Sequence, residues 1–203
     1  MSKRNKQKQQ QTQLQARPAG GMAIVTRWPI YEVLVSPTWP DTTRLTSVWV
    51  SRRALDTEKT AVTHMLVDLG CLGVKSALVK RFSTLADYDE FRAKAMGVQP
   101  MMPADLDLVA KILYTAVDYA AELGFKPDFV FNQAEIFLDG AQPEQCAIAV
   151  PVGGPDGKPF FINGPYDDVD RVIATLRRTV GDGNFNYMIQ AGPGGPFDDD
   201  ALE

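Results

Sequence analysis

The stretch "DLGCLGVKSAL", Asp68 to Leu78, holds the residues of this chain best suited to chemistry. A carboxylate, a thiol and an amine lie close together there, at Asp68, Cys71 and Lys75. Three kinds of site use such residues: a phosphate-binding loop, a nucleic-acid clamp and a reactive thiol. Each kind requires a particular spacing, which the sequence either meets or fails.

The spacing of the glycines does not fit a phosphate-binding loop. A Walker motif has four residues between its glycines and a lysine directly after the second, so that backbone N–H groups surround the phosphates. Here two residues separate Gly70 from Gly73, and Val74 precedes Lys75. Nucleotide binding through this loop is therefore not favoured.

Gly70 to Gly73 also reads as the GxxG of a KH domain, which clamps the backbone of four nucleotides. In KH domains this loop joins two helices, whereas here a strand-like run precedes it and its central residues are apolar. Lys75, Lys80 and Arg81 follow, and we interpret them as the solvated face of a helix.

A reactive Cys71 needs a base, and His64 is the only histidine. A thiol at a helix N-terminus can have a lowered pKa. His64 lies seven residues upstream on the same apparent strand, about 20 Å away at ~3.3 Å per residue. Free cysteine is usually buried, so we expect Cys71 and Cys146 in the core, with Cys146 beginning a strand.

Acidic residues gather in "GPYDDVDR", at Asp167, Asp168 and Asp170. They would suit Mg²⁺, but helix capping and the helix dipole explain them without a ligand, and we favour that reading. We expect no metal or cofactor. If the protein has a site, we expect it at the bend around Cys71 and at the nearby Gly164–Asp168 turn.

The charge is unevenly distributed along a chain whose net charge is −4. The first 23 residues are glutamine-rich and contain no acid, whereas the C-terminal segment reads "FDDDALE". We predict a disordered basic arm over 1–23, a single domain over 24–190 and a disordered acidic tail over 191–203. The arm carries five cations, Lys3, Arg4, Lys6, Lys8 and Arg17.

Hydrophobic patterns predict an α+β domain with an antiparallel sheet packed against three to five helices. Strand-like runs over 30–36, 46–53 and 61–70 predict a three-stranded meander. A hairpin over 146–164 and a last strand over 185–190 are expected to complete the sheet. Gly70 and Gly73 are expected to turn the chain from a central strand into a helix.

Helical signals cover the middle and the last third of the chain. We predict helices over 83–96, 102–125, 128–140 and 165–183, with Ser83 or Thr84, Pro103 and Asp128 at the N-terminal ends of the first three. In the last helix Val169, Val172, Ile173, Leu176 and Val180 recur at helical spacing and form its expected buried stripe.

Three segments, "VDLGCLGVKSAL", "YTAVDYAAELGFKPDFVFNQAEIFLDG" and "DGKPFFINGPYDD", resemble a family of uncharacterised bacterial proteins. Its motifs are VDxxCLGVKxA, GFxPxxDF and GKPFxxxGPYDD, and the resemblance spans about residues 28–190. The family form has an aromatic residue in place of Gly70 and an aspartate in place of Ser76. The resemblance implies no established activity and no catalytic residues.

These observations leave several functions open. The first is a non-enzymatic cytoplasmic accessory protein, whose body binds a protein partner and whose arm makes weak contact with RNA, DNA or a ribosome. The cytoplasm is expected because two isolated cysteines make no disulfide framework and no apolar signal or membrane segment is seen. The second is a small thiol-dependent or hydrolytic enzyme centred on Cys71 with Asp68 and Lys75. The third is an antitoxin or inhibitor from a mobile locus.

Overall fold

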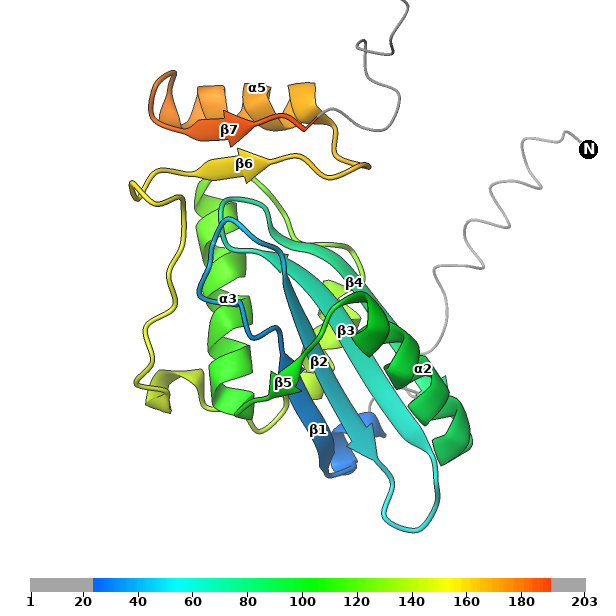
Figure 1. Cartoon of the computed structure of the whole chain (residues 1–203). Helices are drawn as coiled ribbons and strands as arrows, with labels where there is room; N and C mark the ends of the chain where they lie inside the picture. The colour runs from blue at the N-terminus through cyan, green and yellow to red at the C-terminus, as the bar shows by residue number, and fades with distance from the viewer. Residues whose placement is uncertain (1–23, 191–203) are drawn as a thin grey trace, which may run out of the picture.

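The computed structural model describes residues 24–190 as an α+β fold, as the sequence predicts (Figure 1). The predicted arm over 1–23 and tail over 191–203 lie outside the described residues. The strands of the first half are β1 Ile30–Val35, β2 Thr46–Arg53, β3 Thr60–Asp68, β4 Gly73–Phe82 and β5 Met102–Pro103. The other main elements are α2 Leu85–Val98, α3 Leu106–Glu122, α4 Phe131–Ala134, β6 Phe160–Ile162, α5 Val169–Val180 and β7 Asn186–Met188. Short 3₁₀ turns occur at η2 Val25–Arg27, η3 Glu135–Leu138 and η4 Pro143–Gln145.

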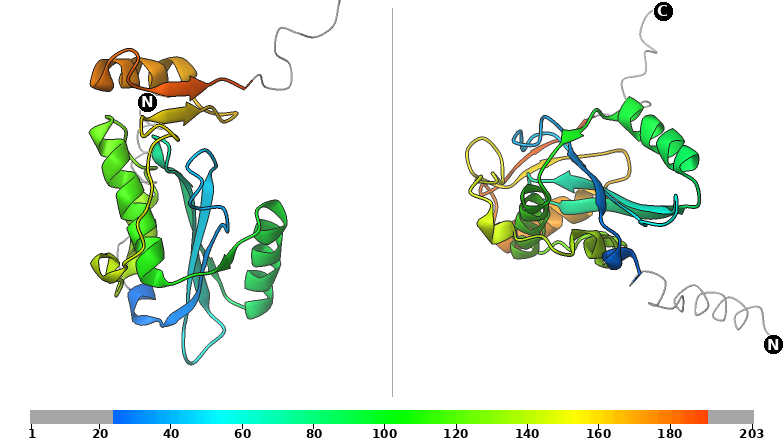
Figure 2. Two further views of the ribbon diagram at one scale, coloured as in Figure 1. Left: turned by 60° about the vertical axis from the view of Figure 1, so that its left-hand side comes forward. Right: turned by 90° about the horizontal axis from the view of Figure 1, so that it is seen from below.

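The main sheet is antiparallel, in the order β4-β3-β2-β1-β5. Both of its faces are covered: α3 and α4 pack on one face, and α2 packs on the other (Figure 2). This explains why seven of the eight residues of β2 are buried rather than every second one. On the α2 face Trp49 donates a hydrogen bond of 3.1 Å to Tyr88, which holds the helix on the sheet.

The predicted meander is confirmed and is longer than expected, because residues 73–82 form β4 and not a helix. The chain reverses at residues 69–72, and Asp68 faces Gly73 across the hairpin. The prediction of a strand-to-helix bend was therefore wrong. The spacing of the apolar residues in "GVKSALVKRF" does not distinguish a helix from a strand. Pairing with β3 makes this segment a strand.

The predicted C-terminal hairpin over 146–164 was also wrong. Residues 146–159 contain no strand, and Cys146 begins none and is only partly buried, so its predicted place in the core was wrong. Pro151, Pro155 and Pro159 supply no backbone N–H for a ladder in this segment. Only β6 forms, and it pairs in parallel with β7 in a separate two-stranded sheet.

The unit β6-α5-β7 packs against one end of the main body (Figure 1). Strands joined through a helix can run parallel, because the crossover returns the chain to the starting edge. Val172 and Leu176 are buried, and Val169, Ile173 and Val180 pack beside them, so the predicted stripe of α5 is confirmed. The cluster also contains Cys71, Leu72 and Leu123 from the main body.

Two helix starts differ from the prediction: that of α3, and that of α4, whose N-cap is Val130 and not Asp128. Pro103 belongs to β5, and α3 starts at Leu106 with Asp105 as its N-cap, accepting from the Asp107 N–H at 2.9 Å. Thr84 caps α2 as predicted. Within residues 24–190, no helix has both the length and the apolar content needed to cross a membrane.

Gly73 combines a left-handed backbone conformation with a lack of room for a side chain. Its φ is +70°, and a Cβ there would lie 2.8 Å from Ala120 Cβ and 3.0 Å from Ala116 O on α3. Gly73→Ala is expected to lower the free energy of unfolding by about 2–4 kcal/mol, from backbone strain and overpacking together. Urea unfolding measures the change.

Gly157→Ala is the matched control, because Gly157 has φ +78° but a Cβ there would meet no atom within 4 Å. It should lower the free energy of unfolding by only about 1–2 kcal/mol, from strain alone. Equal losses in the two variants would contradict the tight contact between the turn and α3.

Candidate functional site

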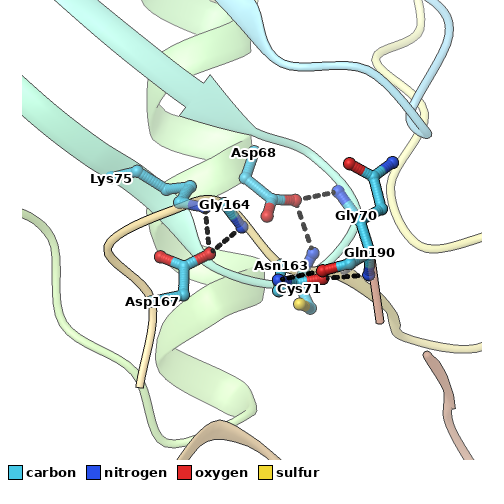
Figure 3. Close-up of polar contacts among 8 residues, drawn as sticks. All are labelled: Asp68, Gly70, Cys71, Lys75, Asn163, Gly164, Asp167 and Gln190. Carbon is cyan, nitrogen blue, oxygen red and sulfur yellow. Dashed lines mark hydrogen bonds and ion pairs between the residues drawn. The ribbon is translucent and has the colours of Figure 1, made fainter. Parts of the chain in front are cut away.

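The β3–β4 turn is built around the side chain of Asp68. Its Oδ1 accepts hydrogen bonds from the backbone N–H of Gly70 at 2.8 Å and of Cys71 at 3.0 Å (Figure 3). A carboxylate that accepts from the next residues of its own chain is the usual means of closing a tight turn. Asp68 therefore has a structural role, which the sequence does not reveal by itself.

The Asp68 carboxyl is buried, and burial raises its pKa to about 6. The hydrogen bond from Cys71 and the charge of Lys75 oppose this rise without cancelling it. Asp68, Lys75 and Gly164 all line one cavity. Asp68 thus brings a proton-exchanging group to a cavity wall.

Cys71 is fully buried in the apolar cluster beneath α5, as predicted. Burial raises the pKa of its thiol, and the neighbouring Asp68 raises it further. The thiol therefore stays protonated at neutral pH, which does not favour a thiol nucleophile. His64 lies elsewhere on β3, with its Nε2 3.1 Å from Ser47 Oγ, and burial lowers its pKa.

Lys75 joins the turn to a segment far along the chain. Its Nζ lies 2.5 Å from Asp167 Oδ2, and the same oxygen accepts from the Gly164 N–H at 2.7 Å (Figure 3). Both side chains are largely buried, at 12% and 16% exposed. The two segments expected to carry any site, the bend and the Gly164–Asp168 turn, therefore meet in space.

A cavity of about 230 Å³ lies where these segments meet. One wall is the β1–β2 loop with Thr42, Thr43 and Arg44, and another is the pair Asn163 and Gln190. Asn163 Oδ1 accepts from the Gln190 N–H at 2.6 Å, which holds the end of β7 in place. Sequence reasoning missed these wall residues, since a threonine–arginine loop and a lone asparagine carry no motif.

The acids of the "GPYDDVDR" segment have different roles. Asp168 is the N-cap of α5 and accepts from the Arg171 N–H at 3.1 Å, so the predicted capping role is confirmed. Asp167 holds Lys75 instead. Over residues 24–190 no cluster of three or more His, Cys, Asp or Glu side chains is arranged to hold a metal ion.

The five arm cations, Lys3, Arg4, Lys6, Lys8 and Arg17, lie outside the described residues. Lys80 and Arg81 lie on β4 rather than on a helix, and Lys80 Nζ is 4.4 Å from the centre of the Phe91 ring. Asp68, Cys71 and Lys75 thus belong to one turn and the strand that follows it. Their side chains serve three different contacts and form no common reactive centre.

Comparison of the chain with protein-family models, with curated proteins and with solved structures found no match. The resemblance to the uncharacterised bacterial family therefore stays a prediction.

The raised pKa of Asp68 gives a pH test. Between its ordinary pKa of 3.8 and its folded value of about 6, the folded state binds more proton than the unfolded state. Ionised Asp68 therefore destabilises the fold as pH rises through this window, and the penalty is complete above about pH 6. Asp68→Asn keeps an acceptor oxygen for the turn but cannot ionise.

Unfolding in urea at about pH 5 and about pH 7.5 should show the effect. The stability of Asp68→Asn relative to the natural chain should increase by about 1–1.5 kcal/mol between these pH values. Groups other than Asp68 titrate in both proteins and cancel in the difference. Parallel pH profiles would show that Asp68 has an ordinary pKa in the folded protein.

Burial of Cys71 predicts a difference between the two thiols. With a limiting thiol reagent at neutral pH, the half-buried Cys146 should be labelled at least about ten times faster than the fully buried Cys71. Peptide mass spectrometry measures both rates, and labelling in urea is the control in which the difference should vanish. Faster labelling of Cys71 in the folded protein would restore the thiol-enzyme hypothesis.

Proposed function

We propose that this protein is a non-enzymatic cytoplasmic accessory protein that binds nucleic acid, alone or on a ribosome, through its basic arm. One observation carries the choice of binding over catalysis: the three candidate reactive residues are already used to build the fold. Asp68 closes a turn, Cys71 fills an apolar cluster and Lys75 is held by Asp167.

The enzyme alternative keeps less support. A thiol-dependent reaction needs a thiolate, and burial opposes its formation at Cys71. A hydrolytic reaction would retain only Asp68, which could exchange a proton with a molecule in the cavity of about 230 Å³. The amine of Lys75 is paired with Asp167 and is not free to act as a nucleophile.

The physical basis of the proposal is the charge of the arm. The first 23 residues contain five cations and no acid, whereas the rest of the chain has more acids than cations. Cations that neutralise phosphates release condensed counterions, so binding is favourable, blind to sequence and sensitive to salt. Such an arm would tether the acidic body to nucleic acid, and the body would remain available for a protein partner.

A salt series tests this proposal. In the variant K3Q/R4Q/K6Q/K8Q/R17Q, the slope of log affinity against log salt for single-stranded RNA should decrease by as much as about 3.5, since each phosphate contact contributes about 0.7. Fluorescence anisotropy between about 50 and 200 mM salt measures the slope.

The matched control exchanges each arm lysine for arginine and each arm arginine for lysine, which keeps the charge, and it should bind as the natural chain does. An unchanged slope in the neutralised variant, or no RNA binding by the natural chain, would contradict the proposed role of the arm.

A further inference from the structure

A second hollow lies on the other side of the Lys75–Asp167 ion pair, with a volume of about 640 Å³. We call it the α5 groove. It is formed by α5, by the loop that follows α3 and by the turn before α5, and its lining includes Phe125, Lys126, Tyr166, Arg171, Thr175 and Arg178. Gly124 allows α3 to end against α5, since a Cβ there would lie 3.3 Å from Thr175 Cγ2.

The cations and acids of the α5 groove differ in what they contact. Its three acids are engaged: Asp167 by Lys75, Asp168 by the Arg171 N–H, and Asp128 by the Val130 N–H at 2.8 Å. The side chains of three exposed cations, Lys126, Arg171 and Arg178, have no ion pair or hydrogen bond with residues 24–190. The lining, which also includes Lys75, holds four cations and three acids, so its formal charge is +1, and within residues 24–190 its charged side chains without a partner are cations.

Arg171 and Arg178 form a row of positive charge along one face of α5. Arg171, Thr175 and Arg178 recur at helical spacing and lie on one face of α5, beside its buried stripe. Seven residues of helix separate the two guanidinium-bearing positions by about 10 Å along the axis. Two phosphates of one strand can contact the two ends of such a row, whereas a single phosphate would use only one end of it.

Aromatic rings stand at the same groove. Tyr166 is 98% exposed at the turn before α5, although a ring of this size usually buries much of its surface. Phe125, which is partly exposed, lines the same groove. Cations that follow a phosphate backbone, together with aromatic rings on which bases stack, are the two components of single-strand recognition.

We propose that the α5 groove binds single-stranded nucleic acid, with Lys126, Arg171 and Arg178 on the phosphates and Tyr166 stacked on a base. This inference rests on the proposed function, because it makes the groove a second contact for the strand that the arm attracts. An acidic chain with a few exposed cations in one groove binds locally rather than over a broad face.

The test compares four full-length proteins on a fluorescent single-stranded RNA across a salt series. Arg171→Gln with Arg178→Gln should lower the salt slope by about 1.4, and Lys59→Gln with Lys94→Gln should leave it unchanged. Lys59 and Lys94 are exposed, on the β2–β3 loop and on α2, outside the groove. The fourth protein carries the neutralised arm, and circular dichroism confirms that each variant is folded.

The stacking contact has its own pair of variants. Tyr166→Ala should weaken binding about fivefold or more at fixed salt, whereas Tyr166→Phe keeps the ring and should bind nearly as the natural chain does. The slope of log affinity against log salt should be the same for both variants and the natural chain, because the tyrosine ring carries no charge. A free mononucleotide should compete weakly, since it offers one phosphate to a row of cations.

The outcomes separate the two proposals. If the arm variant loses binding and the groove variants do not, the groove proposal is overturned and the arm stands. If the groove variants lose binding while the arm variant does not, the groove proposal is supported and the proposed role of the arm is contradicted. A mononucleotide that binds as tightly as the RNA would overturn the single-strand assignment in favour of a small-molecule site.

Discussion

The space available to the backbone at the β3–β4 turn limits how the C-terminal third of the protein can pack. A Cβ on Gly70 would lie 2.5 Å from the carbonyl oxygen of Phe160, and the Gly70 carbonyl itself accepts from the Phe160 N–H at 3.0 Å. A Cβ on Gly73 would lie 2.8 Å from Ala120 Cβ of α3 on the other side. Because both positions lack side chains, one turn can contact α3 and the chain leading into β6 at the same time.

This contact brings charged groups together where their side chains are largely buried. Asp68 faces the interior with a raised pKa, and Lys75 is held against Asp167. Buried charges are tolerated only when they are paired or hydrogen-bonded, and both conditions are met here by the turn and by the Gly164 N–H. The polar residues that first suggest catalysis thus maintain the junction between the two parts of the fold.

The same ion pair separates two hollows of different character. The smaller one holds the buried Asp68 carboxyl, and the larger one is bordered by exposed cations of α5 and by an exposed ring. The unpaired cations at the larger hollow can attract an anion locally although the chain as a whole is acidic. A ligand-binding role on this side of the molecule therefore needs no reactive side chain.

The sequence determined the features that depend on near neighbours. The meander of β1–β3, the apolar stripes of α3 and α5 and the Asp168 cap all follow from spacing within a few residues. The identity of β4, the parallel pairing of β6 with β7 and the contact between Lys75 and Asp167 were decided by tertiary structure. The apolar pattern of residues 73–82 fits a helix or a strand, and pairing with β3 makes it a strand. Lys75 and Asp167 are 92 positions apart in the sequence, so no local pattern predicts their contact.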